Sequence, residues 1–266
     1  MKLGVIGCGK MGSALLKGAI EAGAVDPADV HLHDAFAGCV EKLAADTGAA
    51  AAGSNAAVVD AAEAVLLCTK PHDMLDMIRL LPPLGGGHLF ISIAAGLELV
   101  TLEDALGEEV RVIRVMPNTP ALVGKGASAF ARGVCATDAD ADFVKALLAS
   151  VGSVVEVPER LMNAVTGLSG SGPAYIYTVI EALSDGGVLM GLPKDKAILL
   201  AAQTVAGAAE MVLQTGEHPA ALRDQVTSPG GTTIAGLSEI EGGAMRSTLI
   251  EAVRAASERA AELGES

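Results

Sequence analysis

Three glycines close to the N-terminus have the type and spacing needed to hold a phosphorylated ligand. Gly7, Gly9 and Gly12 form a G-x-G-x-x-G pattern between an apolar strand-like segment, residues 2–6, and a helical segment, residues 10–23. In that context the first glycine allows a tight turn, the second lets the backbone approach a pyrophosphate, and the third permits close helix–strand packing. The pattern predicts a diphosphate at a helix N-terminus, with a ligand-free glycine turn as the alternative.

An acidic residue lies where the ribose of such a dinucleotide would bind. Asp34 ends the second predicted strand, residues 30–34, roughly 20 residues after the last glycine. A carboxylate there accepts hydrogen bonds from ribose hydroxyls and repels a 2′-phosphate, and no Arg or Lys lies between Asp34 and Glu41. The sequence therefore favours NADH over NADPH. The alternative is that Asp34 caps the helix that starts nearby.

Short stretches after three later strands combine small, polar and charged residues, namely 68–71, 92–96 and 116–120. In a doubly wound sheet, ligands bind beyond the carboxyl ends of the strands. Lys70 could attract a phosphate or a carboxylate there, the small residues 94–96 would let a flat ring lie against the backbone, and Asn118 could orient polar groups. Each has a structural alternative, because Pro71 can begin a helix and Asn118 can hold a turn.

The elements that must position these residues alternate between strand and helix up to about residue 158. The predicted strands are continuous apolar runs, which is typical of a parallel sheet covered on both faces. From about residue 160 no strand is predicted, and four helical segments follow, at 174–192, 194–216, 219–226 and 245–263. We predict an α/β fold with a dinucleotide-binding domain at 1–158 and an all-helical domain at 159–266.

Composition excludes several other classes of protein. The net charge is −14 and aromatic residues make up 2 %, so neither a phosphate-neutralising surface nor a base-stacking platform is expected. No continuous apolar run reaches the ~18 residues of a membrane span, and the N-terminus does not resemble a signal peptide. The four cysteines lack C-x-x-C spacing, so we expect no metal site and reduced thiols in the cytoplasm: Cys8, Cys39, Cys68 and Cys135.

A second glycine-rich stretch, SPGGTT at 228–233, lies in the helical part of the chain. Gly230 and Gly231 expose backbone N–H groups, and Thr232 and Thr233 can cap the helix that follows. A small carboxylate could bind at that helix start without an arginine. The alternative is a glycine turn between two helices.

Several segments in order along the chain closely resemble pyrroline-5-carboxylate reductase, the last enzyme of proline biosynthesis. They are TKP at 69–71, SIAAG at 92–96, MPNTP at 116–120, GLSGSGPAYIYTVIEALSDGGVLMGLP at 167–193 and GEHPAALRDQVTSPGGTTIAGL at 216–237. The resemblance covers essentially the whole chain. Its SPGGTT segment is highly specific, whereas the glycine pattern alone is not.

The resemblance implies a Rossmann-type domain followed by a helical dimerisation domain. It implies hydride transfer from NADPH or NADH to a cyclic imine, 1-pyrroline-5-carboxylate, giving L-proline. It also implies homodimers that interlock through the helices and often form decamers, with each active site built between two subunits. The partners expected are thus a small-molecule substrate and further copies of this chain, and neither nucleic acid nor membrane.

The same resemblance assigns residues to the site. Thr233 would bond the ring nitrogen as the catalytic residue, and the backbone of 230–233 would receive the carboxylate. The implied substrate-binding residues are Glu159, Ser228, Gly230, Gly231, Thr232 and Thr233. The cofactor-binding residues, from the glycine pattern and the resemblance together, are Ile6, Gly7, Cys8, Gly9, Lys10, Met11, Gly12, Asp34, Asn55, Cys68, Thr69, Lys70, Pro71, Ala94, Ala95, Asn118 and Gln225.

Two positions depart from the family pattern. Gln225 stands where an Asn is expected, and Asp34 followed by Ala35 stands where relatives commonly carry Ser, Thr or Asn, often with a nearby Arg. The second departure argues against the NADPH preference frequent in the family.

Two rival functions remain open from the residues. The first is a related reductase of β-hydroxyacids or of other imines. The hydroxyacid enzymes usually need a Lys on the first long helix of the helical domain, and none lies between Lys145 and Lys194. A catalytically silent NAD(H) sensor would have no need of the anion site at 228–233. For the imine reductase, Thr233 is a poor proton source, so a protonated imine or a bound water is the expected acid and catalysis would consist mainly of positioning.

Overall fold

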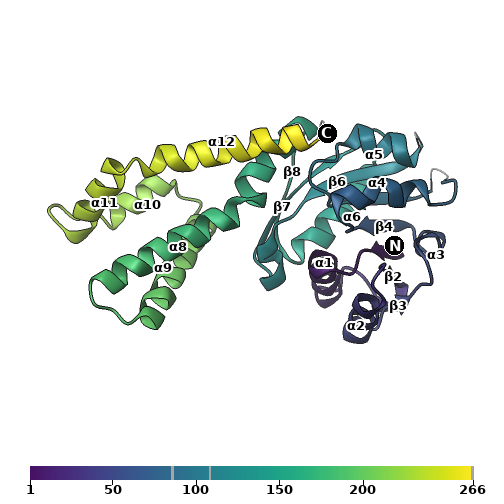
Figure 1. Cartoon of the computed structure of the whole chain (residues 1–266), viewed down its shortest axis with the longest axis horizontal. Coiled ribbons are helices and arrows are strands. Elements are labelled where there is room, and N and C mark those ends of the chain that lie inside the picture. Colours follow the sequence, from purple (N-terminus) through teal and green to yellow (C-terminus); the bar gives the residue numbers. More distant parts are fainter. Residues whose placement is uncertain (85–86, 108, 265–266) are drawn as a thin grey trace. The chain divides into compact units, whose positions relative to one another are not determined.

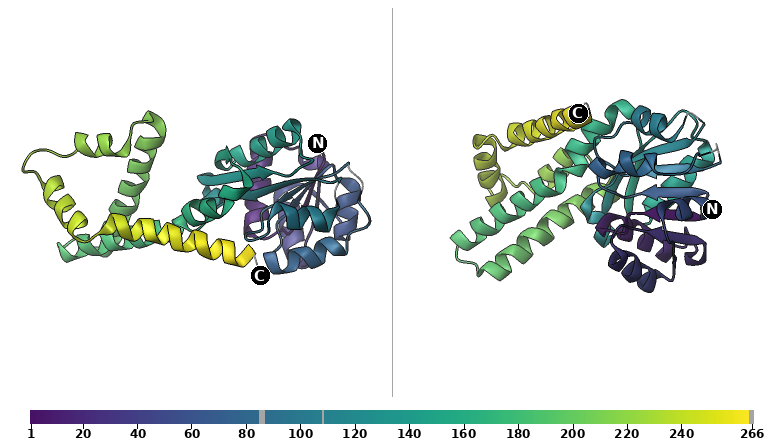
Figure 2. Two further views of the ribbon diagram at one scale, coloured as in Figure 1. Left: turned by 90° about the horizontal axis from the view of Figure 1, so that it is seen from above. Right: turned by 45° about the vertical axis from the view of Figure 1, so that its right-hand side comes forward.

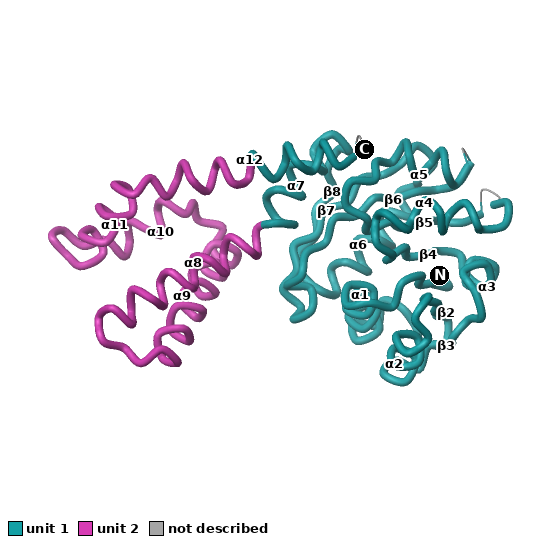
Figure 3. The backbone as a smooth tube through the Cα atoms, in the orientation of Figure 1, with its two compact units in different colours: residues 1–171, 254–266 teal, residues 172–253 magenta. Residues whose placement is uncertain are grey.

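The computed structural model describes residues 1–84, 87–107 and 109–264, and the chain divides into two compact units (Figure 3). Unit 1 comprises Met1–Ser171 and Arg254–Ser266, and unit 2 comprises Gly172–Val253. The division falls after residue 171, and the end of the chain belongs to unit 1. The predicted domain boundary after residue 158 stays a prediction.

Unit 1 contains an eight-stranded sheet in the order β3-β2-β1-β4-β5-β6-β7-β8 (Figure 1). The strands are β1 (Leu3–Ile6), β2 (Val30–His33), β3 (Ala50–Ala51), β4 (Ala64–Leu67), β5 (Leu89–Ser92), β6 (Arg111–Met116), β7 (Gly126–Arg132) and β8 (Gly152–Glu156). The first six strands pair in parallel, which confirms the doubly wound α/β prediction. One correction is needed: β7 runs antiparallel to β6, so the sheet is not wholly parallel.

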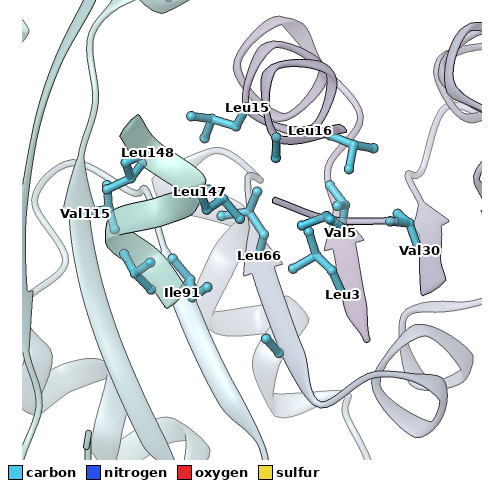
Figure 4. Packing of buried hydrophobic residues seen from close by; sticks show 14 of the residues in the cluster. Leu3, Val5, Leu15, Leu16, Val30, Leu66, Ile91, Val115, Leu147 and Leu148 are labelled. Carbon is cyan, nitrogen blue, oxygen red and sulfur yellow. The ribbon is translucent and has the colours of Figure 1, made fainter. Parts of the chain in front are cut away.

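Helices cover both faces of this sheet. One face packs against α1 (Lys10–Glu21), α2 (Ala37–Thr47) and α6 (Asp138–Ala149), through buried side chains such as those labelled in Figure 4. The other packs against α3 (Asn55–Ala61), α4 (Pro71–Arg79) and α5 (Leu99–Leu106). Because alternate residues of each strand point to opposite faces, Leu3 and Val5 enter the first core while Ile6 enters the second.

Shorter turns of helix connect these elements within unit 1. They are η1 (Pro27–Asp29), η2 (Thr119–Val123), η3 (Glu159–Leu161), α7 (Met162–Val165) and a π-helical turn, η4 (Thr166–Gly170). The segment from β8 to η4 leads the chain into unit 2.

Unit 2 is helical over its described residues. It holds α8 (Gly172–Leu189), α9 (Lys194–Thr215), α10 (Pro219–Gln225), α11 (Thr232–Gly242) and the first part of α12 (Met245–Gly264). The helices α8 and α9 lie side by side, in green in Figure 2, where Gly187 leaves room for Ala197. Four of these helices match the predicted segments, and α11 is additional.

Many apolar side chains of unit 2 are exposed within a single chain. Leu189 is 86 % exposed, Met190 83 % and Leu199 64 %. Among the described residues, one helix, α9, is long and apolar enough by length and composition to cross a membrane, and 11 % of its most apolar stretch is buried. Exposed apolar surface on this scale needs a covering partner.

Candidate functional site

The predicted cofactor residues other than Gln225 lie in unit 1, at or after the carboxyl ends of its strands. The strand order reverses between β1 and β4, which makes the carboxyl ends of these strands the topological switch point where ligands bind in such folds. Two backbone hydrogen bonds hold the strand ends together there. The N–H of Gly7 donates to the His33 carbonyl at 2.9 Å, and that of Cys68 donates to the Ile6 carbonyl at 2.7 Å.

The three glycines occupy three different environments. Gly7 has a φ of +102°, and a Cβ there would lie 2.6 Å from the Cys68 carbonyl carbon. A Cβ on Gly12 would lie 2.2 Å from the Gly7 oxygen, so α1 can pack this closely only without one. A Cβ on Gly9 would meet no atom within 4 Å. The open space at Gly9 lies in front of a helix start that no side chain caps, which fits a bound diphosphate.

Asp34 braces this glycine loop. Its Oδ2 accepts a hydrogen bond from the Cys8 N–H at 2.6 Å, and its Oδ1 accepts one from the Phe36 N–H at 2.9 Å. The N-cap residue of α2 is Phe36, and no side-chain hydrogen bond caps that helix. Asp34 therefore does not cap α2. Its carboxylate lies at the mouth of the loop, where the ribose is predicted.

The thiols beside the loop are uncharged. Burial, with a smaller contribution from Asp34, raises the pKa of Cys8 to about 12. Burial and then the nearby Cys8 raise the pKa of Cys68 still further. Neither cysteine therefore places a thiolate in front of an anionic ligand near neutral pH.

Four further predicted residues follow the ends of β3 and β4. Asn55 is the first residue of α3, and its helix is capped by Ser54, whose Oγ accepts from the Ala57 N–H at 3.1 Å. Lys70 is exposed and precedes Pro71, which begins α4 as expected. The buried hydroxyl oxygen of Thr69 has no hydrogen-bond partner among the described residues.

The loop after β5 has an exposed residue that a ligand could contact, whereas the amide of Asn118, after β6, is already hydrogen-bonded. Ala94 is buried and Ala95 exposed, so the β5–α5 loop offers a small apolar surface. Asn118 donates through Nδ2 to the Ser169 carbonyl at 3.0 Å and accepts through Oδ1 from the Ala127 N–H at 2.9 Å. The oxygen and the nitrogen of its amide thus both bind the protein backbone. This is the turn-holding role that was given as the alternative to a cofactor contact.

Glu159 is tied to a residue that the sequence analysis did not single out. Its Oε1 accepts from Arg114 Nη1 at 2.6 Å and from the Leu99 N–H at 3.1 Å. Arg114 is 3 % exposed, in the middle of β6. The only signal for it in the sequence was a positive charge inside the apolar run VRVIRVM.

A cavity of about 750 Å³ opens beside the glycine loop at Cys8, Gly9 and Lys10 and continues between α1, α2 and η2. The loop is further fixed by Ser13, which the sequence analysis also missed and whose hydroxyl donates to the Cys8 carbonyl at 2.9 Å. A short polar residue one turn into α1 was its only sequence signal.

The loop at 228–233 lies in unit 2 and forms a tight turn. Gly230 has a φ of +64°, and the Gly231 N–H donates to the Ser228 carbonyl at 3.1 Å. A Cβ on Gly231 would lie 2.3 Å from Ser228 Oγ. The expectation that Thr232 and Thr233 cap the next helix is wrong, because Gly231 is the N-cap residue and the two threonines open α11. No side chain caps these first amides, so they are available to a carboxylate.

Gln225, predicted at the cofactor, also lies in unit 2. It ends α10, and its Nε2 donates to Glu217 Oε2 at 2.7 Å. The predicted residues thus gather in two places: the cofactor set and Glu159 in unit 1, and Gln225 with residues 228–233 in unit 2.

Two family descriptions match this chain. Pyrroline-5-carboxylate reductase dimerisation matches residues 159–263, and NADP oxidoreductase coenzyme F420-dependent matches residues 2–96. A pyrroline-5-carboxylate reductase of Methanosarcina acetivorans is 47 % identical over 264 residues, which are 99 % of this chain and 98 % of the relative.

Two solved structures are similar over nearly their whole length. A pyrroline-5-carboxylate reductase from Coxiella burnetii has a TM-score of 0.94 and 33 % identity, covering 100 % of this chain and 99 % of that one. Pyrroline carboxylate reductase of Plasmodium falciparum with NADP bound has a TM-score of 0.87 and 32 % identity, covering 99 % and 98 %.

Proposed function

The chain belongs to the pyrroline-5-carboxylate reductase family, and from that membership we propose its reaction in detail. It is an oxidoreductase that reduces the cyclic imine 1-pyrroline-5-carboxylate to L-proline with a nicotinamide cofactor, the final step of proline biosynthesis. The observation that carries this is the full-length match to reductases of one name, at 47 % identity for the archaeal relative. The glycine loop of unit 1 supports a nicotinamide cofactor independently of this match, because its geometry suits a bound diphosphate.

We propose that the cofactor is NADH in preference to NADPH. The support is Asp34, whose carboxylate lies beside the Cys8 N–H, and the absence of Arg or Lys from residues 35–40. The glycine loop before α1, with Lys70 and Asn55, would hold the remaining phosphate and ribose groups. The Plasmodium falciparum relative was solved with NADP, so the preference of this chain needs its own measurement.

The substrate is proposed to bind at residues 228–233. The uncapped first amides of α11 would receive its carboxylate, since N–H groups at a helix start favour an anion. The Thr233 hydroxyl would bond the ring nitrogen, because a hydroxyl both donates and accepts. Ser228 would shape the turn from behind Gly231. For Glu159 a substrate contact stays a prediction.

The chemistry asked of these residues is mainly positioning. A bound nicotinamide supplies the hydride. Thr233 is a poor acid, so the proton would come from an imine that arrives protonated or from water. Holding two reactants in register can supply about 7–11 kcal/mol of the barrier. No metal ligand set is required for this reaction.

The dimerisation match over residues 159–263 supports homo-oligomerisation. We further propose that each active site draws on two subunits and that dimers assemble into a decamer, as the family resemblance implies. The exposed apolar helices of unit 2 support a dimer interface over a membrane contact. A cytoplasmic location stays a prediction, and so does the lack of a nucleic-acid partner, which the net charge of −14 supports.

The test is the initial rate of NADH and of NADPH oxidation with 1-pyrroline-5-carboxylate. Turnover with NADH as the better substrate supports the whole proposal. Turnover with NADPH as the better substrate keeps the reductase and removes the role given to Asp34. Failure with both cofactors contradicts the reaction itself, and other cyclic imines and then an NAD(H)-sensing role would be tested.

A further inference from the structure

The loop that joins β5 to α5, residues 93–98, is fixed at its first residues by Ser92. The hydroxyl of Ser92 is fully buried, accepts from the Ala94 N–H at 3.3 Å, and lies 3.3 Å from the Met74 sulfur, to which it donates. This loop carries Ala94 and Ala95, which are predicted cofactor-binding residues, and we take the flat ring predicted to lie against them to be the nicotinamide. Its start is therefore held by the core of the sheet.

The far end of the loop is fixed from a distant part of the chain. The N–H of Leu99, the first residue of α5, donates to Glu159 Oε1, and α5 has no side-chain cap of its own. Glu159 thus acts as the cap of a helix that lies 60 residues earlier in the sequence. Capping groups of this kind fix the angle at which a chain enters a helix.

Glu159 depends on Arg114 for its orientation. Both of its hydrogen bonds use Oε1, while Oε2 is buried and has no hydrogen-bond partner in the described parts of the chain. Arg114 pairs with Oε1 at 2.6 Å from an almost fully buried place in β6. A buried ion pair adds little to stability compared with apolar residues of similar size. Its presence here is better explained by placement of the group that it holds.

The middle of the loop is backed by the end of the chain. Gly96 has a φ of +81°, and a Cβ there would lie 3.4 Å from the Leu263 carbonyl oxygen. A Cβ on Gly264 would lie 3.0 Å from the Gly96 oxygen. The last turn of α12, which belongs to unit 1, therefore packs backbone to backbone against the loop (Figure 1).

We infer that Glu159, held by Arg114, is a positioning residue that sets the β5–α5 loop against the nicotinamide ring of the cofactor. The inference rests on the proposed function, because it needs a nicotinamide at this loop. Glu159 acts through the Leu99 N–H and needs no contact with substrate. The adenosine half of the cofactor would lie at the glycine loop and Asp34, which this carboxylate does not touch.

The experiment compares binding of NADH with binding of ADP-ribose, which lacks the nicotinamide. The variant is Arg114→Met/Glu159→Leu, which replaces both charges by apolar groups and so leaves no buried charge unpaired. We expect the Kd for NADH to rise about tenfold, because a small displacement of the β5–α5 loop weakens its contacts with the nicotinamide. The Kd for ADP-ribose should change less than about twofold, because this ligand does not reach the loop. If NADPH is the better cofactor, it replaces NADH and 2′-phospho-ADP-ribose replaces ADP-ribose.

A second variant covers the case in which the first does not fold. Glu159→Gln leaves Arg114 without an anionic partner and is expected to lower stability, but its amide oxygen can still accept from Arg114 and from the Leu99 N–H, so its ratio of NADH to ADP-ribose affinity is expected to stay within about twofold of the wild type. A tenfold change in that ratio for Glu159→Gln would contradict a role through the N–H.

The matched control is a second ion pair of β6, half-buried Arg111 with the buried Asp140 at 2.5 Å, at the start of the strand. Arg111→Met/Asp140→Leu should lower stability and leave the affinity ratio unchanged. Equal losses for both ligands in the Arg114 variant, no change in either, or the same ratio change in the control would each overturn the inference. Because these readouts need no imine, they remain decisive if the proposed reaction fails.

Discussion

The carboxylate of Asp34 serves the protein before any ligand binds, because it accepts hydrogen bonds from the Cys8 and Phe36 amides. A serine at this position would keep one short acceptor for those amides but would remove the negative charge that repels a 2′-phosphate. The charge should therefore decide cofactor preference, while the hydrogen bonds decide the shape of the loop.

Asp34→Ser is accordingly expected to lower the NADH to NADPH ratio of kcat/KM by about tenfold, or roughly 1.4 kcal/mol. The measurement is the steady-state rate with each cofactor at a fixed concentration of imine. Asp29→Ser is the control, since Asp29 is an exposed acid at the opposite end of β2. An unchanged ratio in Asp34→Ser would remove the charge argument.

The buried thiols of Cys8 and Cys68 predict how stability depends on pH. Burial raises the pKa of both above the ordinary value of 9.0, for Cys8 to about 12. Unfolded thiols lose their protons as the pH passes 9 while the folded ones keep theirs, so the unfolded state binds fewer protons and the free energy of unfolding falls. The stabilisation is complete below about pH 9 and is lost progressively above it.

Urea unfolding at about pH 8 and about pH 11 tests this by comparing wild type with Cys8→Ala/Cys68→Ala. At about pH 8 the variant is expected to be no more stable than the wild type. Between the two pH values its free energy of unfolding is expected to fall less than that of the wild type. Equal losses in the two proteins would show that other groups account for the alkaline dependence.

The glycines in the turn from β1 into α1 have different roles, one in packing and one in leaving space for a ligand. Gly12 makes room for the Gly7 carbonyl, whereas the space beside Gly9 is empty and its φ of −69° suits any residue. Gly12→Ala should destabilise the protein by roughly 1–3 kcal/mol through overpacking. Gly9→Ala should keep or slightly raise stability, because it restricts the unfolded chain.

For cofactor binding we expect Gly9→Ala to raise the Kd of NADH about tenfold or more, since the new methyl group would occupy the approach of the diphosphate. Thermal unfolding and NADH titration of the two variants separate the effects. A Gly9→Ala protein that binds NADH normally would mean that the diphosphate lies elsewhere.

The same elements show which parts of the fold could be predicted from sequence. Local signals were enough for helix starts such as Pro71 and for the apolar strands. The antiparallel direction of β7 was not predictable, because an apolar run reads the same in both directions. The link from Glu159 to Arg114 and Leu99 was also hidden, since it joins residues 45 and 60 positions apart that only the folded sheet brings together. Asn118 was singled out, but its hydrogen bonds to Ser169 and Ala127 could not be predicted, and a contact of Asn118 with the cofactor stays a prediction.

At the scale of the whole molecule, unit 2 carries apolar side chains that a single chain leaves in water. The dimerisation match covers these helices, which supports homo-oligomerisation, and we propose that a second copy of the chain buries these side chains. Leu199, 64 % exposed on α9, is one of the largest such groups. A charge there would have to be buried without a partner in the interface, which is strongly unfavourable.

Leu199→Glu is therefore expected to shift the protein from oligomer to monomer at micromolar concentration and, because the active site is proposed to need two subunits, to lower kcat/KM by about a hundredfold or more. Sedimentation velocity and the imine assay measure the two effects on one preparation. Val134→Glu is the control, because Val134 is 92 % exposed in the turn after β7 and lies outside the helical unit. A Leu199→Glu protein that remains oligomeric and fully active would place the interface elsewhere. A monomer with normal activity would instead show that one chain holds a complete active site.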